Sequence, residues 1–232
     1  MQATSIQSET NRRQGDLAYR SVGWLGTVAC RLMNWEVTVS GEQHIPGTGP
    51  AVIASNHVGY MDFVFLGLAA RRRGRLVRFM AIQSAFDHWL AGPLLRSMHH
   101  IPVDREGDPA AAYRLAVSTL EAGDVIGIHP EGKVTASPLE RPAKSGAVRM
   151  ALLTGAPLIP AAVWGTQRLL APGSRPKLPR HVPITVRMGS PIDLDPSMTP
   201  IELTERLMER IRGLLPEEAR GVGAVQKIPA FD

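Results

Sequence analysis

Cysteine, aromatic side chains and long apolar runs are all scarce in this sequence of 232 residues. Its one cysteine, Cys30, excludes an internal disulfide and any zinc site built from several cysteines. Aromatic residues make up 5% of the chain and no known nucleic-acid-binding motif is present, which argues against a nucleic-acid partner. The G-x-S-x-G elbow of many hydrolases is missing too, as are internal repeats and low-complexity segments.

Basic residues exceed acidic ones, with 26 lysines and arginines against 21 aspartates and glutamates. The formal net charge of +5 attracts partners that carry phosphate, whether nucleic acid, anionic lipid headgroups or a phosphorylated cofactor, and charge alone does not choose among them. An apolar fraction of 44% with 20% charged residues is typical of a folded domain. The length suits one α/β domain with an appendage.

Residues 1–34 are expected to form that appendage, a polar tail followed by a membrane-interface helix. The polar residues 1–15 predict a disordered start, and no cleavable signal peptide is recognisable there. The best membrane candidate is the segment 17–33. Its longest uncharged stretch, 21–30, covers roughly 15 Å as a helix, about half the hydrocarbon thickness of a bilayer. The segment is therefore too short to span.

A helix over residues 17–33 would be amphipathic. At about 100° per residue its polar side chains share one narrow face, and Trp24 lies near the boundary. The polar face holds Arg20, Thr27, Arg31 and Asn34, and the broad apolar side holds Val22, Leu25, Val28, Ala29, Leu32 and Met33. Such a helix can lie in the membrane interface, or it can pack on the domain as an ordinary surface helix.

Strand and helix patterns alternate over residues 35–232. Strands are predicted at 36–40, 51–55, 77–82, 124–128, 157–163 and 182–188, and helices at 61–71, 86–98, 109–122 and 145–154. The last helix is predicted to begin with Thr199 as its cap and Glu202 completing a capping box. We therefore expect an α/β fold: a single domain with a largely parallel or mixed central sheet flanked by helices, plus the N-terminal amphipathic helix.

A histidine and an aspartate stand at the predicted junction after the second strand. His57 and Asp62 would diverge by about 140° on one straight helix, so they meet only if His57 lies in a turn before the helix. Gly59 favours such a bend. A carboxylate bonded to one ring nitrogen fixes the histidine tautomer and leaves the other nitrogen as a base. This pair alone is weak evidence of catalysis.

Three further segments strengthen that evidence. The segment 100–105 ends in Arg105, which is suited to holding an anion. The segment 128–133 places the turn-forming Gly132 beside Lys133. A third, starting at Lys144, leads through a predicted helix to Ala156-Pro157-Leu158-Ile159-Pro160.

Together the four blocks, in this order, resemble the lysophosphatidic acid acyltransferase (1-acylglycerol-3-phosphate O-acyltransferase) family. That family carries N-H-x-x-x-x-D, then F-I-D-R, then F-P-E-G-T-R-S, then a lysine-glycine helix before a P-I-V-P-type strand. The matching residues are Asn56, His57, Asp62, Ile101, Asp104, Arg105, Pro130, Glu131, Gly132, Lys144, Gly146, Pro157 and Pro160. The resemblance covers about residues 35–166, and four blocks in register are specific.

The resemblance implies that residues 35–232 form an acyltransferase domain without metal or other cofactor. His57 would act as the general base, oriented by Asp62, while backbone N–H groups near the turn stabilise the oxyanion. The donor would be acyl-CoA or acyl carrier protein, and the acceptor the free hydroxyl of lysophosphatidic acid. Substrate-binding roles would fall to Arg105, Glu131, Gly132, Lys133 and Lys144. We expect a peripheral or monotopic protein on an anionic membrane surface, at the cytoplasmic face of the cell membrane.

The sequence also departs from the family pattern. Lys133-Val134 stands where Thr-Arg is usual, and His129 replaces a phenylalanine. The strand after the first helix lacks its frequent basic residue, since residues 80–83 read Met-Ala-Ile-Gln. Those cations are thought to hold the acceptor phosphate in the family. Another lysophospholipid or a lipid alcohol therefore stays open as the acceptor.

Simpler interpretations remain for several residues. His99, His100 and His129 suggest a metal site, but no ligand spacing completes it. The arginine-rich run 71–78 is either a solvated helix end or a contact for anionic lipid or coenzyme A phosphates. Glu131 can brace a loop instead of lining a substrate site, and Arg105 can form a structural ion pair. A non-catalytic membrane-binding protein is the alternative for the whole chain.

Overall fold

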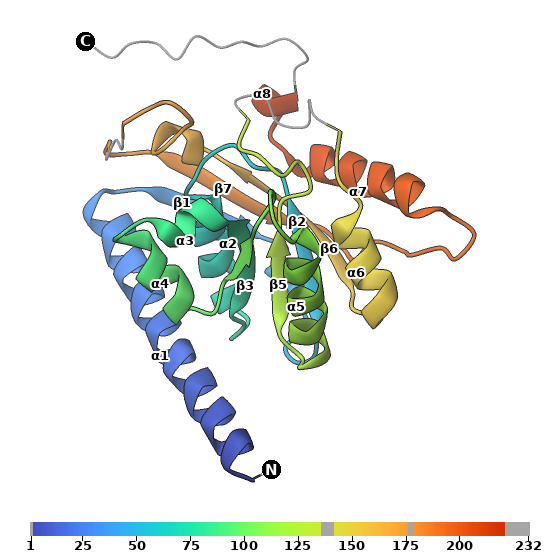
Figure 1. Cartoon of the computed structure of the whole chain (residues 1–232). Helices are drawn as coiled ribbons and strands as arrows, with labels where there is room; N and C mark the ends of the chain where they lie inside the picture. The colour runs from blue at the N-terminus through green and yellow to red at the C-terminus, as the bar shows by residue number, and fades with distance from the viewer. Residues whose placement is uncertain (1, 136–141, 176–178, 221–232) are drawn as a thin grey trace.

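A seven-stranded mixed sheet forms the centre of the computed structural model, which describes residues 2–135, 142–175 and 179–220 (Figure 1). The strands are β1 (Glu36–Ser40), β2 (Ala51–Ser55), β3 (Val77–Ile82), β4 (Ile101–Val103), β5 (Val125–Ile128), β6 (Leu158–Trp164) and β7 (Pro183–Met188). The helices are α1 (Gln2–Leu32), α2 (Asp62–Arg71), α3 (Gln83–Asp87), α4 (Ala91–Ser97), α5 (Pro109–Glu121), α6 (Gly146–Thr154), α7 (Pro200–Leu214) and α8 (Glu217–Arg220), with short 3-10 turns η1 (Glu42–His44) and η2 (Thr166–Arg168).

The order of the strands across the sheet is β1-β7-β6-β2-β5-β3-β4. Neighbouring strands from β6 to β4 are all parallel, whereas β7 is antiparallel to β6 and β1 is parallel to β7. The prediction of an α/β domain with a mixed central sheet is therefore confirmed. Because parallel strands end at the same edge, the loops that follow β2, β5 and β6 lie side by side.

Helices cover both faces of this sheet, which explains why every residue of β2 is buried. Successive side chains point to opposite faces, so Ile53 packs with Phe65 of α2 in one core while Val52 packs with Leu120 of α5 in the other. Figure 1 shows α1, α3 and α4 at one side of the sheet and α6 and α7 at the other.

Helix α1 is longer than expected, because it begins at Gln2 rather than near Leu17. The prediction of a disordered start over residues 1–15 is therefore wrong for residues 2–15. One side of α1 packs on α2, where Tyr19 is buried and a Cβ added at Gly67 would lie 2.5 Å from the Tyr19 hydroxyl oxygen. Close packing of the two helices thus depends on Gly67 having no side chain.

The opposite side of α1 carries an exposed apolar face. It consists of Leu17, Trp24, Leu25 and Leu32, which are each 58% to 68% exposed. The helix thus packs on the domain with one face and presents apolar side chains outward with the other. Within the described residues, no helix is both long and apolar enough to cross a membrane.

The arginine-rich run is not a solvated helix end throughout. Arg75 is 8% exposed and donates to the backbone carbonyl oxygens of Pro46, Gly49 and Gly123. Arg78 is 2% exposed; it donates to the carbonyl oxygen of Met98 and forms an ion pair with Asp16 of α1. These two arginines connect loops and are therefore unavailable to lipid or coenzyme A.

Two elements differ from prediction. The helix expected at 86–98 is divided into α3 and α4, because the backbone of His88 is extended after α3 and its ring accepts hydrogen bonds from the amides of Leu90 and Ala91. Strand β4 was not predicted; it contains Pro102 and pairs with β3 at the edge of the sheet, where proline is tolerated. The capping box of Thr199 and Glu202 at the start of α7 is confirmed.

Candidate active site

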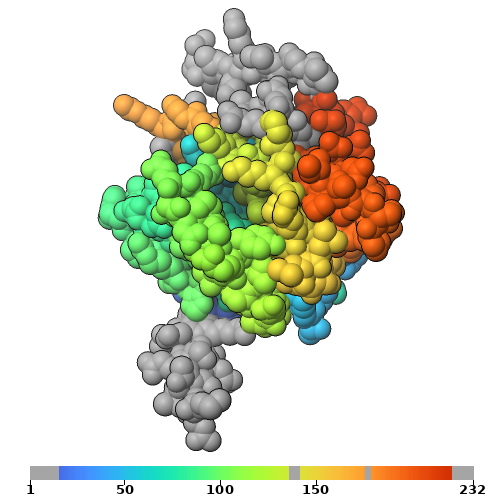
Figure 2. All heavy atoms as spheres, turned by 45° about the vertical axis from the view of Figure 1, so that its right-hand side comes forward, coloured from blue at the N-terminus to red at the C-terminus, as the bar shows by residue number. Residues whose placement is uncertain are grey.

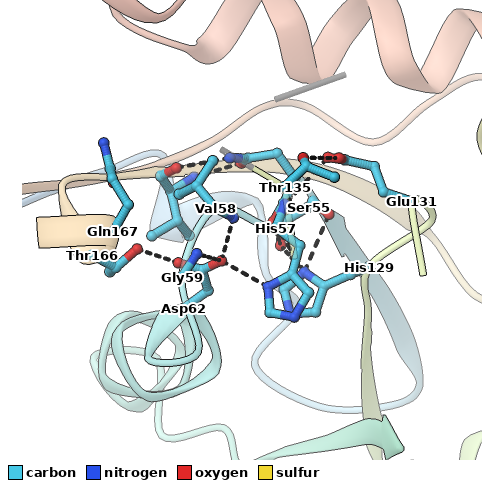
Figure 3. A network of polar contacts seen from close by, with 12 residues as sticks. Ser55, His57, Val58, Gly59, Asp62, His129, Glu131, Thr135, Thr166 and Gln167 are labelled. Atoms are coloured by element: carbon cyan, nitrogen blue, oxygen red, sulfur yellow. Dashed lines mark hydrogen bonds and ion pairs between the residues drawn. The ribbon is translucent and has the colours of Figure 1, made fainter. Parts of the chain in front are cut away.

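The loop between β2 and α2 brings His57 and Asp62 together (Figure 3). The His57 Nδ1 atom lies 2.8 Å from Asp62 Oδ2, and Asp62 is the first residue of α2. The Asp62 side chain is fully buried, whereas that of His57 is 18% exposed. Because an ionised carboxylate only accepts hydrogen bonds, Nδ1 carries the proton and Nε2 is left as the basic atom of the ring.

Asp62 also organises the backbone of the turn. Its Oδ2 atom accepts from the amides of Val58 at 2.8 Å and Gly59 at 3.0 Å, and its Oδ1 atom accepts from the Thr166 hydroxyl. The His57 amide donates to Glu131 Oε1 at 3.2 Å. The expectation that amides of this turn form the oxyanion hole therefore fails for residues 57–59, since each amide is already paired.

Gly59 is needed for a reason other than the bend that we predicted. A Cβ at this position would lie 2.9 Å from the backbone nitrogen of Gln167 and from the carbonyl carbon of Thr166. Only a residue without a side chain lets the turn approach the loop after β6 this closely.

Asn56 extends the pairing of β2 with β6. Its side-chain nitrogen donates to the Val163 carbonyl oxygen at 2.9 Å, and its side-chain oxygen accepts from the Val163 amide at 2.8 Å. The side chain is completely buried and takes the place of a further backbone pair in the ladder. The asparagine of the first block thus fixes where the chain leaves the sheet, immediately before His57.

Glu131 holds the other side of the same turn. It is 5% exposed, and besides accepting from the His57 amide it accepts from the Thr135 hydroxyl at 2.9 Å. The Thr135 amide in turn donates to the His57 carbonyl oxygen at 2.9 Å. Of the two interpretations of Glu131, this geometry supports the loop brace, because both of its carboxylate oxygens bind groups that position His57.

His129 stacks on the ring of His57, with centroids 3.9 Å apart and planes 4° from parallel. Its Nδ1 atom lies 3.0 Å from the Asn56 carbonyl oxygen and 3.3 Å from that of Ser55. Carbonyl oxygens cannot donate, so Nδ1 is protonated. Burial and the neighbouring His57 hold the pKa of His129 well below its usual value. The ring is therefore a neutral support for His57.

Of the other two histidines of the suspected metal site, His99 is exposed and His100 lies in the core. His100 accepts from the Phe79 amide, and burial lowers the pKa of His100 to about 3. Among the described residues, no three histidine, cysteine, aspartate or glutamate side chains are arranged as metal ligands.

Two of the predicted cations meet at the loop after β5. The Arg105 guanidinium donates to the Gly132 carbonyl oxygen, and the Lys144 amide donates to that of Pro130 at 2.9 Å. A Cβ at Gly132, which has a φ of +69°, would lie 4.0 Å from the Lys144 ammonium nitrogen. Arg105, Lys133 and Lys144 are all exposed. Figure 2 shows the surface hollowed between the green and the yellow segments that include these loops.

A histidine whose ring is held by a buried aspartate is an arrangement that general-base transferases and hydrolases use. Comparison with known proteins narrows this class. The family described as Acyltransferase matches residues 36–164, more than half of the chain. The chain therefore belongs to the acyltransferase family.

Individual relatives agree with this assignment. The 1-acyl-sn-glycerol-3-phosphate acyltransferase of Bacillus subtilis (strain 168) is 30% identical over 184 residues, which cover 77% of this chain and 87% of that protein. An enzyme of the same name from Borreliella burgdorferi is 29% identical over 56% of this chain and 52% of its own length. The crystal structure of the 1-acyl-sn-glycerophosphate (LPA) acyltransferase of Thermotoga maritima has the same fold, with a TM-score of 0.67 at 21% identity over 84% of this chain and 78% of that one.

Sequence reasoning missed three contributors to this site. Neither Thr135 nor Thr166 belongs to one of the four matched blocks, although Thr166 stands at the end of the resembling region. Nothing in their spacing indicates a contact with the turn. His129 was considered only as a metal ligand and as a departure from phenylalanine. Its stacking partner became apparent only from the adjacency of β2 and β5.

The neutral state of His129 leads to a prediction about stability and pH. The unfolded chain protonates this histidine below about pH 6.5, whereas the folded protein does not, so its burial makes stability fall as the pH decreases. His129→Phe keeps a stacked ring but removes the titrating group. We expect the variant to lose less stability between pH 6.5 and 5, by up to about 1.4 kcal/mol per pH unit. Denaturant unfolding at several pH values measures the free energy of unfolding of both proteins. If this free energy changes equally with pH in wild type and variant, the prediction is wrong.

Proposed function

We propose that this acyltransferase moves a fatty acyl group from acyl-CoA or acyl carrier protein to the free hydroxyl of lysophosphatidic acid, giving phosphatidic acid. The single observation that carries the proposal is the His57–Asp62 pair, which has the geometry of a base and its orienting carboxylate. The pair occurs in a chain that is similar to a 1-acyl-sn-glycerol-3-phosphate acyltransferase. Neither the chemistry nor the proposal requires a metal or another cofactor. A second candidate acceptor, another lysophospholipid or a lipid alcohol, is favoured by two departures: Val134 stands where the family usually has arginine, and the segment Met80-Ala81-Ile82-Gln83 lacks the frequent basic residue.

In the proposed reaction, His57 Nε2 removes the proton from the acceptor hydroxyl as its oxygen attacks the thioester carbonyl carbon. Asp62 stabilises the imidazolium that forms, because its buried carboxylate is bonded directly to Nδ1. When the tetrahedral intermediate collapses, the C–S bond breaks and His57 returns the proton to the departing thiolate. The oxygen ester and a free thiol are the products, with no covalent acyl-enzyme.

The proposed role of His57 as the base leads to a prediction about activity. His57→Ala should abolish acyl transfer, and Asp62→Asn should lower kcat much more than it raises KM, because it removes the negative charge that stabilises the imidazolium. Release of thiol from acyl-CoA in the presence of lysophosphatidic acid measures both. His181→Ala is the matched control, since this exposed histidine bonds to Asn34 instead of the site. Near-normal turnover by a folded His57→Ala protein would refute the mechanism.

Arg105, Lys133 and Lys144 are proposed to bind the phosphate of the acceptor. All three are exposed, and Arg105 and Lys144 converge on the Gly132 loop that also carries Lys133. Arginine can make a two-pronged contact with phosphate, whereas lysine acts as a point charge. This proposal is independent of the base chemistry, because a different acceptor would leave His57 and Asp62 unchanged.

The test compares lysophosphatidic acid with an uncharged monoacylglycerol in wild type, Arg105→Ala, Lys133→Ala and Lys144→Ala. A lost contact to a bound anion costs about 1.5–3 kcal/mol, so we expect kcat/KM for the phosphorylated acceptor to fall roughly ten- to a hundredfold in at least one variant. Arg114→Ala is the control, because Arg114 is an exposed arginine of α5 that pairs with Asp108. If all variants keep the wild-type preference, or if wild type prefers the uncharged lipid, the phosphate assignment is wrong.

We further propose that the protein attaches peripherally or monotopically to anionic lipid at the cytoplasmic face of the cell membrane. The exposed apolar face of α1 supports this, because the exposed Arg20 and Arg31 border it along one side. An apolar face beside cations suits a bilayer surface that offers both acyl chains and phosphate.

A charge placed in this face should weaken membrane attachment. Burying a leucine in an apolar environment is worth about 1.5–3 kcal/mol, so we expect Leu25→Glu to reduce sedimentation with anionic vesicles more than tenfold. Leu115→Glu is the matched control, because Leu115 is 48% exposed on α5 while Leu25 is 58% exposed. Equal losses in both variants, or none in either, would mean that another surface is the anchor.

A further inference from the structure

Thr166 lies in η2, the turn that follows β6, and is the one residue outside the β2–α2 turn that contacts the Asp62 carboxylate in the described part of the chain. Both side chains are fully buried. We propose that Thr166 is a positioning residue, whose hydroxyl keeps Asp62 charged and aimed at His57. This inference rests on the proposed function of His57 as the general base.

The loop that carries Thr166 is itself fixed against the turn. The Tyr60 amide donates to the Leu170 carbonyl oxygen at 3.0 Å, and the bare Gly59 faces the backbone of Thr166 and Gln167. Within the loop, the Thr166 carbonyl oxygen accepts from the amides of Leu169 and Leu170. The position of the hydroxyl is thus determined by β6 and by backbone contacts on both sides, and not by Asp62 alone.

The two oxygens of Asp62 have different partners. Three donors converge on Oδ2, namely His57 Nδ1 and the amides of Val58 and Gly59, whereas Oδ1 receives the Thr166 hydroxyl. A carboxylate anchored at both oxygens cannot rotate about its Cβ–Cγ bond, so Oδ2 stays directed at the imidazole. Without Thr166, Oδ1 would be a buried charged oxygen lacking this donor.

Within the described residues, the charge of Asp62 is stabilised by hydrogen-bond donors and by its place at the start of α2, and not by a cationic side chain. The titratable groups around the pair are His129, stacked on His57, and Glu131, bonded to the His57 amide. In the described residues, no lysine or arginine forms an ion pair with Asp62. Among the described residues, Thr166 and His57 are the two side chains that donate a hydrogen bond to this carboxylate.

Removing the hydroxyl has a predictable sign. The carboxylate then shares less of its charge, holds the His57 proton more tightly and is itself protonated more easily. Either effect makes the pair take up its first proton at a higher pH. Because the base must be unprotonated to work, the acidic limb of the activity profile moves to higher pH as well.

The experiment compares Thr166→Val, which has nearly the same shape, with Thr166→Ser, which keeps the hydroxyl. Thr204→Val is the matched control, because Thr204 is also buried and donates to the Pro200 carbonyl oxygen within α7, away from the site. Nuclear magnetic resonance of the 15N-labelled imidazoles follows the titration of His57 without substrate. Thiol release from acyl-CoA with lysophosphatidic acid gives kcat, KM and the pH profile.

We expect Thr166→Val to raise the midpoint of the His57 titration by about 0.5–1 pH unit and to lower kcat about ten- to a hundredfold, with KM changed less than about threefold. Thr166→Ser and Thr204→Val should resemble wild type in titration and turnover. If Thr166→Val does not fold, Thr166→Ala replaces it, and the contrast with Thr166→Ser decides in the same way.

An unshifted titration and normal kcat in a folded variant without the hydroxyl would overturn the proposal. Equal impairment of the serine and valine variants would also do so, because it would show that the methyl group matters and the hydrogen bond does not. If wild type transfers no acyl group while the titration still shifts, the proposed function fails but the coupling of Thr166 to the pair stands.

Discussion

The buried carboxylate of Asp62 is the charge around which this part of the molecule is arranged. An ionised group without water costs several kcal/mol unless donors surround it, and here the donors come from two separate segments of the chain. The β2–α2 turn bends so that two amides and one imidazole reach Oδ2, and the loop after β6 supplies a hydroxyl to Oδ1. The turn has its shape because the carboxylate must be satisfied.

Two further contacts hold that turn from outside. Asn56 bonds the start of the turn to β6, and Glu131, in the loop after β5, accepts a hydrogen bond from the His57 amide. The three central strands β5, β2 and β6 are adjacent and parallel, so their ends meet at one edge and each contributes one restraint. His57, the proposed general base, thus follows the central strand of the sheet and is restrained from the strands on both sides.

Much of the fold could be predicted because the central strands are continuous apolar runs and the long helices are periodic. The predictions that failed depended on single side chains. His88 divides one helix, Pro102 concealed a short edge strand, and the arginine-rich run appeared solvated although Arg75 and Arg78 bind backbone carbonyls of distant loops. Contacts of a side chain with a remote backbone leave no periodic pattern in a sequence, so no reading of spacing finds them.

The site divides in the same way. His57 and Asp62 were recognisable because they lie in one short segment, five positions apart. The resemblance to a family then assigned them roles. Thr166 lies more than a hundred positions from Asp62 along the chain, and Thr135 nearly eighty from His57, so only the sheet brings these segments together. The amides of the turn were misassigned, because whether an N–H group is free depends on every oxygen around it.

Helix α2 links the two regions that the proposals concern. Its first residue is Asp62, and its outer side packs against α1 where Tyr19 faces the bare backbone at Gly67. A single helix of ten residues therefore joins the carboxylate to α1, which presents apolar side chains outward. Because α1 packs directly on α2, the orientation of α1 on any surface that it touches also sets the direction in which the His57 imidazole faces.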